Sequence, residues 1–277
     1  MTNTTEAERE SFARDGFLIR RSVLDATEVG LVRSALHEDA AIRRRAYQLD
    51  DGHGGSTEIC VWNHPGDDTL GRLARLPRTA EVSAELLGGE VYHYHSKVTS
   101  KSPGGGGTWA WHQDYGYWYQ NGCPRPDMLS IGIAVSEQTR ENGCLELLQG
   151  SQLCGRLDHL KYASQTAAVR ERVDNLVDVL PLVHFEAEPG DIIFFHSNTL
   201  HRSAPNTSDA AREVVLCAYN RADNDPFFEH HHPQYTPLNL VDDGELLSGG
   251  LSMDGESRRF MDPATDRSID GFATINA

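Results

Sequence analysis

Residues Thr108–Trp118 read TWAWHQDYGYW, and the fold is built around this stretch. Its first half is rich in aromatic and β-favouring residues and a glycine follows at position 116, which predicts a strand that runs into a loop. Side chains two residues apart in a strand point to the same face, so we expect His112 and Asp114 to face one interior together. An imidazole and a carboxylate side by side supply two of the three protein ligands of a metal site.

A His-x-Asp triplet is weak evidence by itself, because roughly one is expected by chance in an Asp-rich chain with 13 histidines. The downstream stretch Asp191–Tyr219 strengthens it. There an apolar run follows a Pro-Gly-Asp turn signal and leads to His201, and a second β-like run starts just after Arg212. If neighbouring strands present these two side chains to one pocket, His201 completes a two-histidine, one-carboxylate face. That face is typical of non-haem Fe(II) oxygenases.

Composition narrows the class of protein. At 277 residues the chain has the length of one large domain, and its net charge of −16 disfavours nucleic acid and anionic membranes as partners. The five cysteines are odd in number and lack CxxC spacing, which argues against a disulfide framework or a structural zinc site. The chain has neither an apolar run of about 18 residues nor an apolar stretch near its start. We therefore expect a cytoplasmic monomer or homodimer that acts on a small molecule.

The order of predicted elements indicates the fold class. Helices are predicted at 6–15, 25–45 and 70–87, with a short strand at 16–19 and a loop at 47–56. Seven β-like runs follow, at 91–99, 108–112, 129–136, 144–148, 179–186, 192–195 and 214–220. Helices followed by strands predict a mainly β fold with flanking helices, a double-sheet jelly roll. We expect one domain over 1–277, with a helical part at about 1–89, a jelly-roll core at about 90–222 and a C-terminal tail at about 223–277.

Three segments stand apart from this pattern. Segment 151–178 looks helical and charged, and two interpretations stay open, a lid over the barrel mouth or a surface insertion. Gly104–Gly107 lacks the Lys-Ser/Thr of a phosphate loop, so a hairpin connection is expected. His230–His232 would alternate faces on an extended chain, which disfavours ligation of one ion, although one of the three could line a substrate pocket.

Several motifs together resemble the phytanoyl-CoA dioxygenase family of Fe(II)/2-oxoglutarate oxygenases, and within it the ectoine hydroxylase group. The resemblance covers about residues 10–235. The matching motifs are WHQD at 111–114, YWYQNGCPRP at 117–126, NGCLELLQGS at 142–151, EPGDIIFFH at 188–196, and His201-x-Ser203 followed by Arg212. Two departures are Gln149–Gln152 in place of a frequent Pro-Gly-Ser-His and Thr99 where ectoine hydroxylases carry Asn.

The resemblance implies a double-stranded β-helix core of the cupin type and a metal site. Fe(II) would be held by His112, Asp114 and His201. The distal carboxylate of the cosubstrate 2-oxoglutarate would pair with Arg212, whose guanidinium can form two parallel hydrogen bonds, and Ser203 would add a hydroxyl donor.

Further contacts follow from the ectoine hydroxylase group. His95, Thr99 and Ser130 would touch 2-oxoglutarate, and Trp118 would line the substrate pocket, where its ring suits a cationic or zwitterionic group. By strand alternation Arg202 should point elsewhere, and Gln113 should face away from the metal pair and position the loop.

The implied reaction consumes O2 and 2-oxoglutarate, releases succinate and CO2, and hydroxylates an unactivated C–H bond of a small polar, amino-acid-like or natural-product metabolite. An acyl thioester is the second substrate class. Because Asp114 is present, hydroxylation is favoured over halogenation. Two alternatives remain open at this point, a zinc hydrolase with the same ligands and a non-catalytic cupin-like binding protein.

Overall fold

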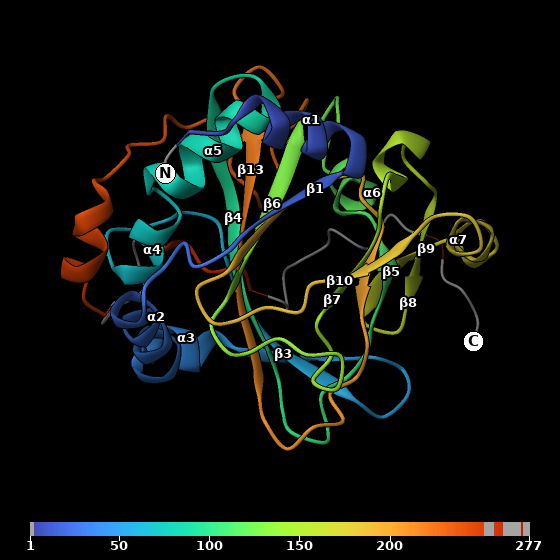
Figure 1. Ribbon diagram of the computed structural model, residues 1–277, viewed down its shortest axis with the longest axis horizontal. Helices are drawn as coiled ribbons and strands as arrows, with labels where there is room; N and C mark the ends of the chain where they lie inside the picture. The colour runs from blue at the N-terminus through green and yellow to red at the C-terminus, as the bar shows by residue number, and fades with distance from the viewer. Residues whose placement is uncertain (1–2, 252–257, 263–272, 274–277) are drawn as a thin grey trace.

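The computed structural model describes residues 3–251, 258–262 and 273. Two antiparallel sheets face each other and form a jelly roll of the cupin type, with helices beside it (Figure 1). The predicted fold class is therefore confirmed. Part of the predicted C-terminal tail, residues 252–257, 263–272 and 274–277, lies outside the described residues.

The larger sheet contains, in spatial order, β1 (Phe17–Arg20), β11 (Ile192–His196), β6 (Met128–Ala134), β13 (Arg212–Arg221), β4 (Val91–Lys101), β3 (Ser56–Trp62) and β2 (Tyr47–Asp50). The smaller sheet contains β10 (Leu182–His184), β7 (Leu145–Leu148), β12 (His201–Ser203) and β5 (Trp109–His112). A separate hairpin is made of β8 (His159–Tyr162) and β9 (Gln165–Ala168).

The helices are α1 (Glu6–Asp15), α2 (Ala26–Glu38), α3 (Ala40–Arg45), α4 (Thr69–Leu73), α5 (Pro77–Leu87), α6 (Asp114–Trp118) and α7 (Arg170–Val177), with 3-10 turns at η1 (Ser151–Cys154) and η2 (Asp243–Ser248). Capping boxes begin α1, at Thr5 and Glu8, and α2, at Asp25 and Glu28. None of the helices in the described part of the chain combines the length and apolar character that a bilayer crossing requires.

The main core lies between helices α1 to α5 and the outer face of the larger sheet (Figure 1). Strand β6 shows how the sheet is used on both faces: Leu129, Ile131 and Ile133 pack in this core, whereas Ser130 between them faces the barrel interior. Strand β4 likewise turns a row of polar side chains inward. The barrel interior is therefore polar where the two sheets approach each other.

Several predicted elements differ from the structure. The helix predicted at 25–45 is interrupted at Asp39, which has an extended backbone and caps α3. The helix predicted at 70–87 is two helices, because Pro77 begins α5 and the residue before a proline disfavours the helical conformation. The loop predicted at 47–56 begins with strand β2, which pairs with β3.

Two further differences concern the barrel. Segment 151–178 was expected to be helical, but it contains η1, the β8–β9 hairpin and only then α7. The three-residue strand β12, which carries His201, is too short to give a periodic signal in the sequence. The glycines 104–107 fall, as predicted, in the connection between β4 and β5.

Candidate active site

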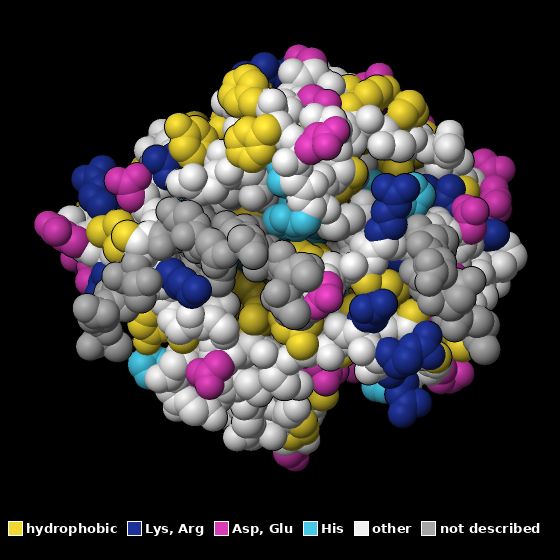
Figure 2. Space-filling model, turned by 180° about the vertical axis from the view of Figure 1, so that it is seen from behind, with side chains coloured by type: hydrophobic (Ala, Val, Ile, Leu, Met, Phe, Trp, Pro, Cys, Tyr) yellow, Lys and Arg dark blue, Asp and Glu magenta, His cyan; other side chains and the backbone are white. Residues whose placement is uncertain are grey.

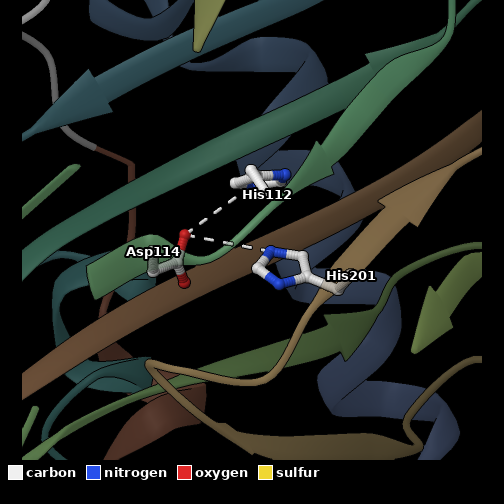
Figure 3. Close-up of side chains that lie close together, drawn as sticks. All are labelled: His112, Asp114 and His201. Atoms are coloured by element: carbon white, nitrogen blue, oxygen red, sulfur yellow. Dashed lines mark ion pairs between the residues drawn. The ribbon is translucent and has the colours of Figure 1, made fainter. Parts of the chain in front are cut away.

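Three side chains from separate elements converge inside the barrel. His112 ends β5, Asp114 begins α6 and His201 begins β12. Strands β5 and β12 are paired so that His201 lies opposite His112. Figure 3 shows both imidazoles turned towards the carboxylate, with each Nε2 atom 3.8 Å from Oδ1 of Asp114. One ligand atom from each residue lies within 4.8 Å of the others, which is the spacing of a shared metal ion.

The hydrogen bonds around the two histidines fix their tautomers. Nδ1 of His112 lies 2.8 Å from the carbonyl oxygen of Ala110, and Nδ1 of His201 lies 2.9 Å from that of Thr199. A carbonyl only accepts, so Nδ1 donates in both rings and each Nε2 keeps its lone pair. Burial lowers the pKa of both imidazoles, which keeps them neutral and ready to bind a metal.

Asp114 is held as a carboxylate. Burial opposes its ionisation, but interactions with His201, Lys97 and His112 and the hydrogen bond from Ser130 outweigh burial and lower the pKa to about 2. The hydroxyl of Ser130 donates to Oδ2 at 2.6 Å, which leaves Oδ1 facing the histidines. Two neutral imidazoles and one carboxylate fit the donor set of a ferrous ion.

The loop predicted after His112 is helix α6, so strand alternation is not what brings Asp114 beside it. Gln113 makes the turn between strand and helix. Its side-chain nitrogen donates to the carbonyls of Gly155 and Asn198, at 2.8 and 2.7 Å, and its side-chain oxygen accepts from the backbone of Leu157. These bonds position the chain between the two ligands, as the sequence predicted for Gln113.

A small cavity of about 40 Å³ adjoins the metal ligands, and its lining includes two buried basic residues, Arg212 and Lys101. Arg212 is held by a hydrogen bond from Nε to Gln138 at 2.8 Å. Lys101 donates from Nζ to the hydroxyl of Ser203 at 2.8 Å and to the carbonyl of Ala204. Burial lowers the pKa of Arg212 to about 10, and burial together with Arg212 lowers that of Lys101 to about 6.

None of the described residues that line this small cavity is acidic. Thr99 also lines it, and its buried hydroxyl has no hydrogen-bond partner. Two basic side chains without an acidic partner and a hydroxyl without a hydrogen-bond partner are costly to bury unless an anion joins them. The structure thus brings Arg212, Ser203 and Thr99 together beside the metal ligands.

Lys101 was missed by the sequence analysis. A signal was present, because His95, Lys97, Thr99 and Lys101 alternate along β4 and share one face. Arg202, by contrast, has its charge paired with Glu146 at 2.8 Å and its guanidinium over the ring of Trp111, although the residue also lines the small cavity.

A larger cavity of about 380 Å³ also adjoins the metal ligands and is lined in part by His112 and Asp114. Trp118 lines it, and its ring meets that of His95 edge to face at 5.7 Å. His95 belongs to this larger cavity and Ser130 binds Asp114, so neither is among the residues that line the small one. Their contact with 2-oxoglutarate stays a prediction.

The β8–β9 hairpin forms part of the wall of the larger cavity through Ser164, Gln165 and Thr166. Gln165 ties the hairpin to β5, since its side chain accepts from the backbone of Ala110 at 3.0 Å and donates to that of Thr108 at 2.9 Å. The β8–β9 part of segment 151–178 is therefore part of the cavity wall, and the role of the segment as a lid stays a prediction.

Comparisons with known proteins agree with this description of the site. The model of the phytanoyl-CoA dioxygenase family matches residues 12–214. L-proline trans-4-hydroxylase from Streptomyces griseoviridis is 30% identical over 82% of this chain and 89% of its own length. Ectoine dioxygenase from Stutzerimonas stutzeri is 27% identical over 78% of this chain and 76% of its own.

Solved structures share the fold. The crystal structure of EctD from S. alaskensis with 2-oxoglutarate and 5-hydroxyectoine matches with a TM-score of 0.73 and 24% identity, over 86% of this chain and 88% of that one. The carbocyclase SnoK from nogalamycin biosynthesis matches with a TM-score of 0.67 and 23% identity, over 94% and 97%. With a family match over most of its length and the metal ligands in place, the chain belongs to the phytanoyl-CoA dioxygenase family.

Proposed function

We propose that this protein is an Fe(II)- and 2-oxoglutarate-dependent dioxygenase that hydroxylates an unactivated C–H bond of a small polar metabolite. The observation that carries the proposal is the convergence of His112, Asp114 and His201 within 4.8 Å, next to a cavity whose described lining includes buried Arg212 and Lys101 and no acidic residue. When bound, iron and 2-oxoglutarate supply the oxidation, in which O2 is consumed, succinate and CO2 are released and one oxygen atom goes to the substrate.

We assign the iron to Nε2 of His112, Nε2 of His201 and a carboxylate oxygen of Asp114. The protein orients these three atoms and keeps them in the protonation state that binds a metal. The backbone carbonyls behind the imidazoles fix their tautomers, and the hydroxyl of Ser130 fixes the carboxylate.

We assign the distal carboxylate of 2-oxoglutarate to Arg212, Lys101, Ser203 and Thr99. A carboxylate between Arg212 and Lys101 would favour the charged form of both, which burial opposes in the free protein. The hydroxyl of Thr99 would gain the partner that it lacks.

We assign the substrate to the larger cavity, with Trp118 and His95 in its wall. Its volume of about 380 Å³ lies near the lower end of the range for small-molecule sites, which supports a small metabolite over an acyl thioester. The relatives named for proline and ectoine chemistry support an amino-acid-like substrate.

The zinc hydrolase alternative requires a carboxylate base near the metal-bound water. Apart from Asp114 itself, the described residues that line the two cavities include no Asp or Glu. The binding-protein alternative is weakened by the relatives, which are named as a hydroxylase and dioxygenases. Both are weaker than the oxygenase on these grounds.

The test is succinate release. The purified protein is incubated with Fe(II), 2-oxoglutarate and ascorbate and offered a panel of amino acids and related cyclic compounds. We expect at least one compound to raise succinate release above the substrate-free rate and to gain a hydroxyl group. Activity with Zn(II) in place of iron, or no compound-dependent succinate at all, would refute the proposal.

We further propose that the protein acts in the cytoplasm, as a monomer or homodimer. All five cysteines are free, and four of them are buried, which suits a reducing compartment. Fractionation of the native host and light scattering of the pure protein test these two points.

A further inference from the structure

The wall of the larger cavity includes residues that lie beyond the family match. That match ends at residue 214, yet His232 and Met261 both line the cavity. On the face shown in Figure 2, histidine and hydrophobic side chains come to the surface together near the middle. The substrate site is therefore completed by a part of the chain that the family pattern does not specify.

This C-terminal part is attached to β3 and to the residues after it. The backbone nitrogen of Met261 donates to the carbonyl of Val61 at 2.9 Å, and that of Asn63 donates to Arg259 at 3.1 Å. Arg258 is fully buried and pairs with Asp39 and Asp68. These contacts hold the segment against the cavity.

His232 is fixed by two neighbours. Its ring stacks on that of His95, with centroids 4.8 Å apart and planes 21° apart. Its Nδ1 atom lies 3.0 Å from Oδ1 of Asn63, whose side-chain nitrogen donates to the carbonyl of His231 at 2.6 Å. Because Oδ1 of Asn63 only accepts, Nδ1 of His232 carries the proton.

It follows that Nε2 of His232 has a free lone pair. With Nδ1 bound to Asn63, Nε2 is the ring atom left to meet a molecule in the cavity. Burial, and then the neighbouring His95, hold the pKa of His232 well below its usual range, so the ring stays neutral at pH 7. His232 therefore offers a hydrogen-bond acceptor.

The described lining of the larger cavity includes neutral acceptors such as Gln48 and Gln165, but few charged ones. Among the described residues that line the larger cavity, Asp114 is the single carboxylate, and it is assigned to the metal. Lys97 is the single Lys or Arg in that lining. An amine of the substrate would find a neutral acceptor in His232 and an aromatic face in Trp118.

We propose that His232 is a substrate-binding residue whose Nε2 accepts a hydrogen bond from an N–H donor of an amino-acid-like substrate, so that the C-terminal segment sets specificity. This inference rests on the proposed function and names the substrate class for the same site.

The test compares matched pairs of ligands in the wild type and in three variants. Ligands are titrated calorimetrically, without oxygen, into protein loaded with Fe(II) and 2-oxoglutarate. Each panel amino acid is matched with a carbocyclic acid of the same shape that lacks the amine, such as L-proline with cyclopentanecarboxylic acid. His232→Phe keeps a stacked ring and removes the acceptor, whereas His232→Gln keeps an acceptor. His230→Phe is the control for disturbance of the segment, because His230 does not line the cavity but accepts a hydrogen bond from the backbone nitrogen of His232.

We expect His232→Phe to weaken binding of the panel amino acid about three- to tenfold, the effect of one lost hydrogen bond, and His232→Gln and His230→Phe to weaken it less. The carbocyclic acid should bind all forms alike. An equal loss for both ligands in His232→Phe would overturn the inference, and so would a panel in which no amine binds the wild type.

Failure of the proposed function would be detected by a different measurement from failure of this inference. The absorption band of the Fe(II)–2-oxoglutarate chelate reports cosubstrate binding independently of any substrate. Amine binding that depends on His232 supports the inference whatever the band shows. Affinity that is equal in all variants overturns it even when the band is normal.

Discussion

Replacing Arg212 with methionine tests the proposed cosubstrate site most directly. Methionine retains much of the length of the side chain and removes its charge. The bound carboxylate would lose a charge-assisted hydrogen bond, and losing one partner of a buried pair typically costs about 3–5 kcal/mol. Lys101 remains in the same cavity, so we take the lower end, about 3 kcal/mol. That corresponds to roughly a hundredfold weaker binding of 2-oxoglutarate.

The assay is titration of the chelate absorption band with 2-oxoglutarate, together with the KM values from succinate release. We expect the KM for 2-oxoglutarate to rise about as much as its Kd while the KM for the organic substrate changes little. Arg221→Met is the matched control, since Arg221 ends the same strand, β13, but pairs with Asp223 at the surface. If Arg212→Met raised both KM values equally, or left the Kd for 2-oxoglutarate unchanged, the assignment of the small cavity would be wrong.

Three further predictions concern the metal, the pH dependence and the C-terminal segment. Asp114→Ala should abolish substrate-dependent succinate release while the circular dichroism spectrum stays native; wild-type turnover in this variant would contradict the metal assignment. Burial lowers the pKa of His93 to about 3, and because the unfolded chain binds this proton with a pKa of about 6.5, stability should fall as pH drops from 6.5 towards 3. The loss from His93 is about 2 kcal/mol at pH 5, and urea unfolding at pH 7.5 and 5 should show a smaller difference in His93→Gln. Arg258→Met leaves the buried carboxylates of Asp39 and Asp68 without their cation and should destabilise the protein by about 3–5 kcal/mol in thermal or urea unfolding, whereas an unchanged midpoint would mean that the ion pairs are not formed.

The metal ligands could be found from the sequence because their residue types are rare in combination and their neighbours form recognisable strands. His201 is the instructive case. Its strand, β12, is too short to show periodicity, but the apolar run at 192–195 and the β-like run after Arg212 bracket it. Adjacent strands placed the residue correctly even though its own strand was not predicted.

For Asp114 the predicted position beside His112 was right, but the predicted secondary structure was wrong. The expected alternation of a strand would have put its side chain beside that of His112, whereas in the structure α6 begins there. What turns the chain is the network of Gln113 with Gly155, Leu157 and Asn198. Those partners are more than 40 positions away, so local propensity carries no signal for them.

The hairpin β8–β9 could not be predicted for a related reason. Segment 151–178 is charged and has helix-favouring residues, and local propensity yields to tertiary contacts. Here Gln165 bonds to the exposed edge of β5 and replaces a neighbouring strand. His159 is packed so closely on Gly116 that a Cβ atom at 116 would lie 2.1 Å from the ring. Such contacts are long-range and specific to this fold.

The distribution of charge separates the surface from the site. The chain has a net charge of −16, yet the described residues lining the two cavities include Lys97, Lys101, Arg202 and Arg212 and one carboxylate, which is assigned to the metal. Under the proposed assignment, the distal carboxylate of 2-oxoglutarate would offset positive charge at Arg212 and Lys101 in the small cavity, while the lining of the larger cavity includes Lys97 and neutral histidines. The net charge therefore reflects the surface of this protein. The sign of the charge in its active site depends on which side chains of β4 and β13 face the barrel interior.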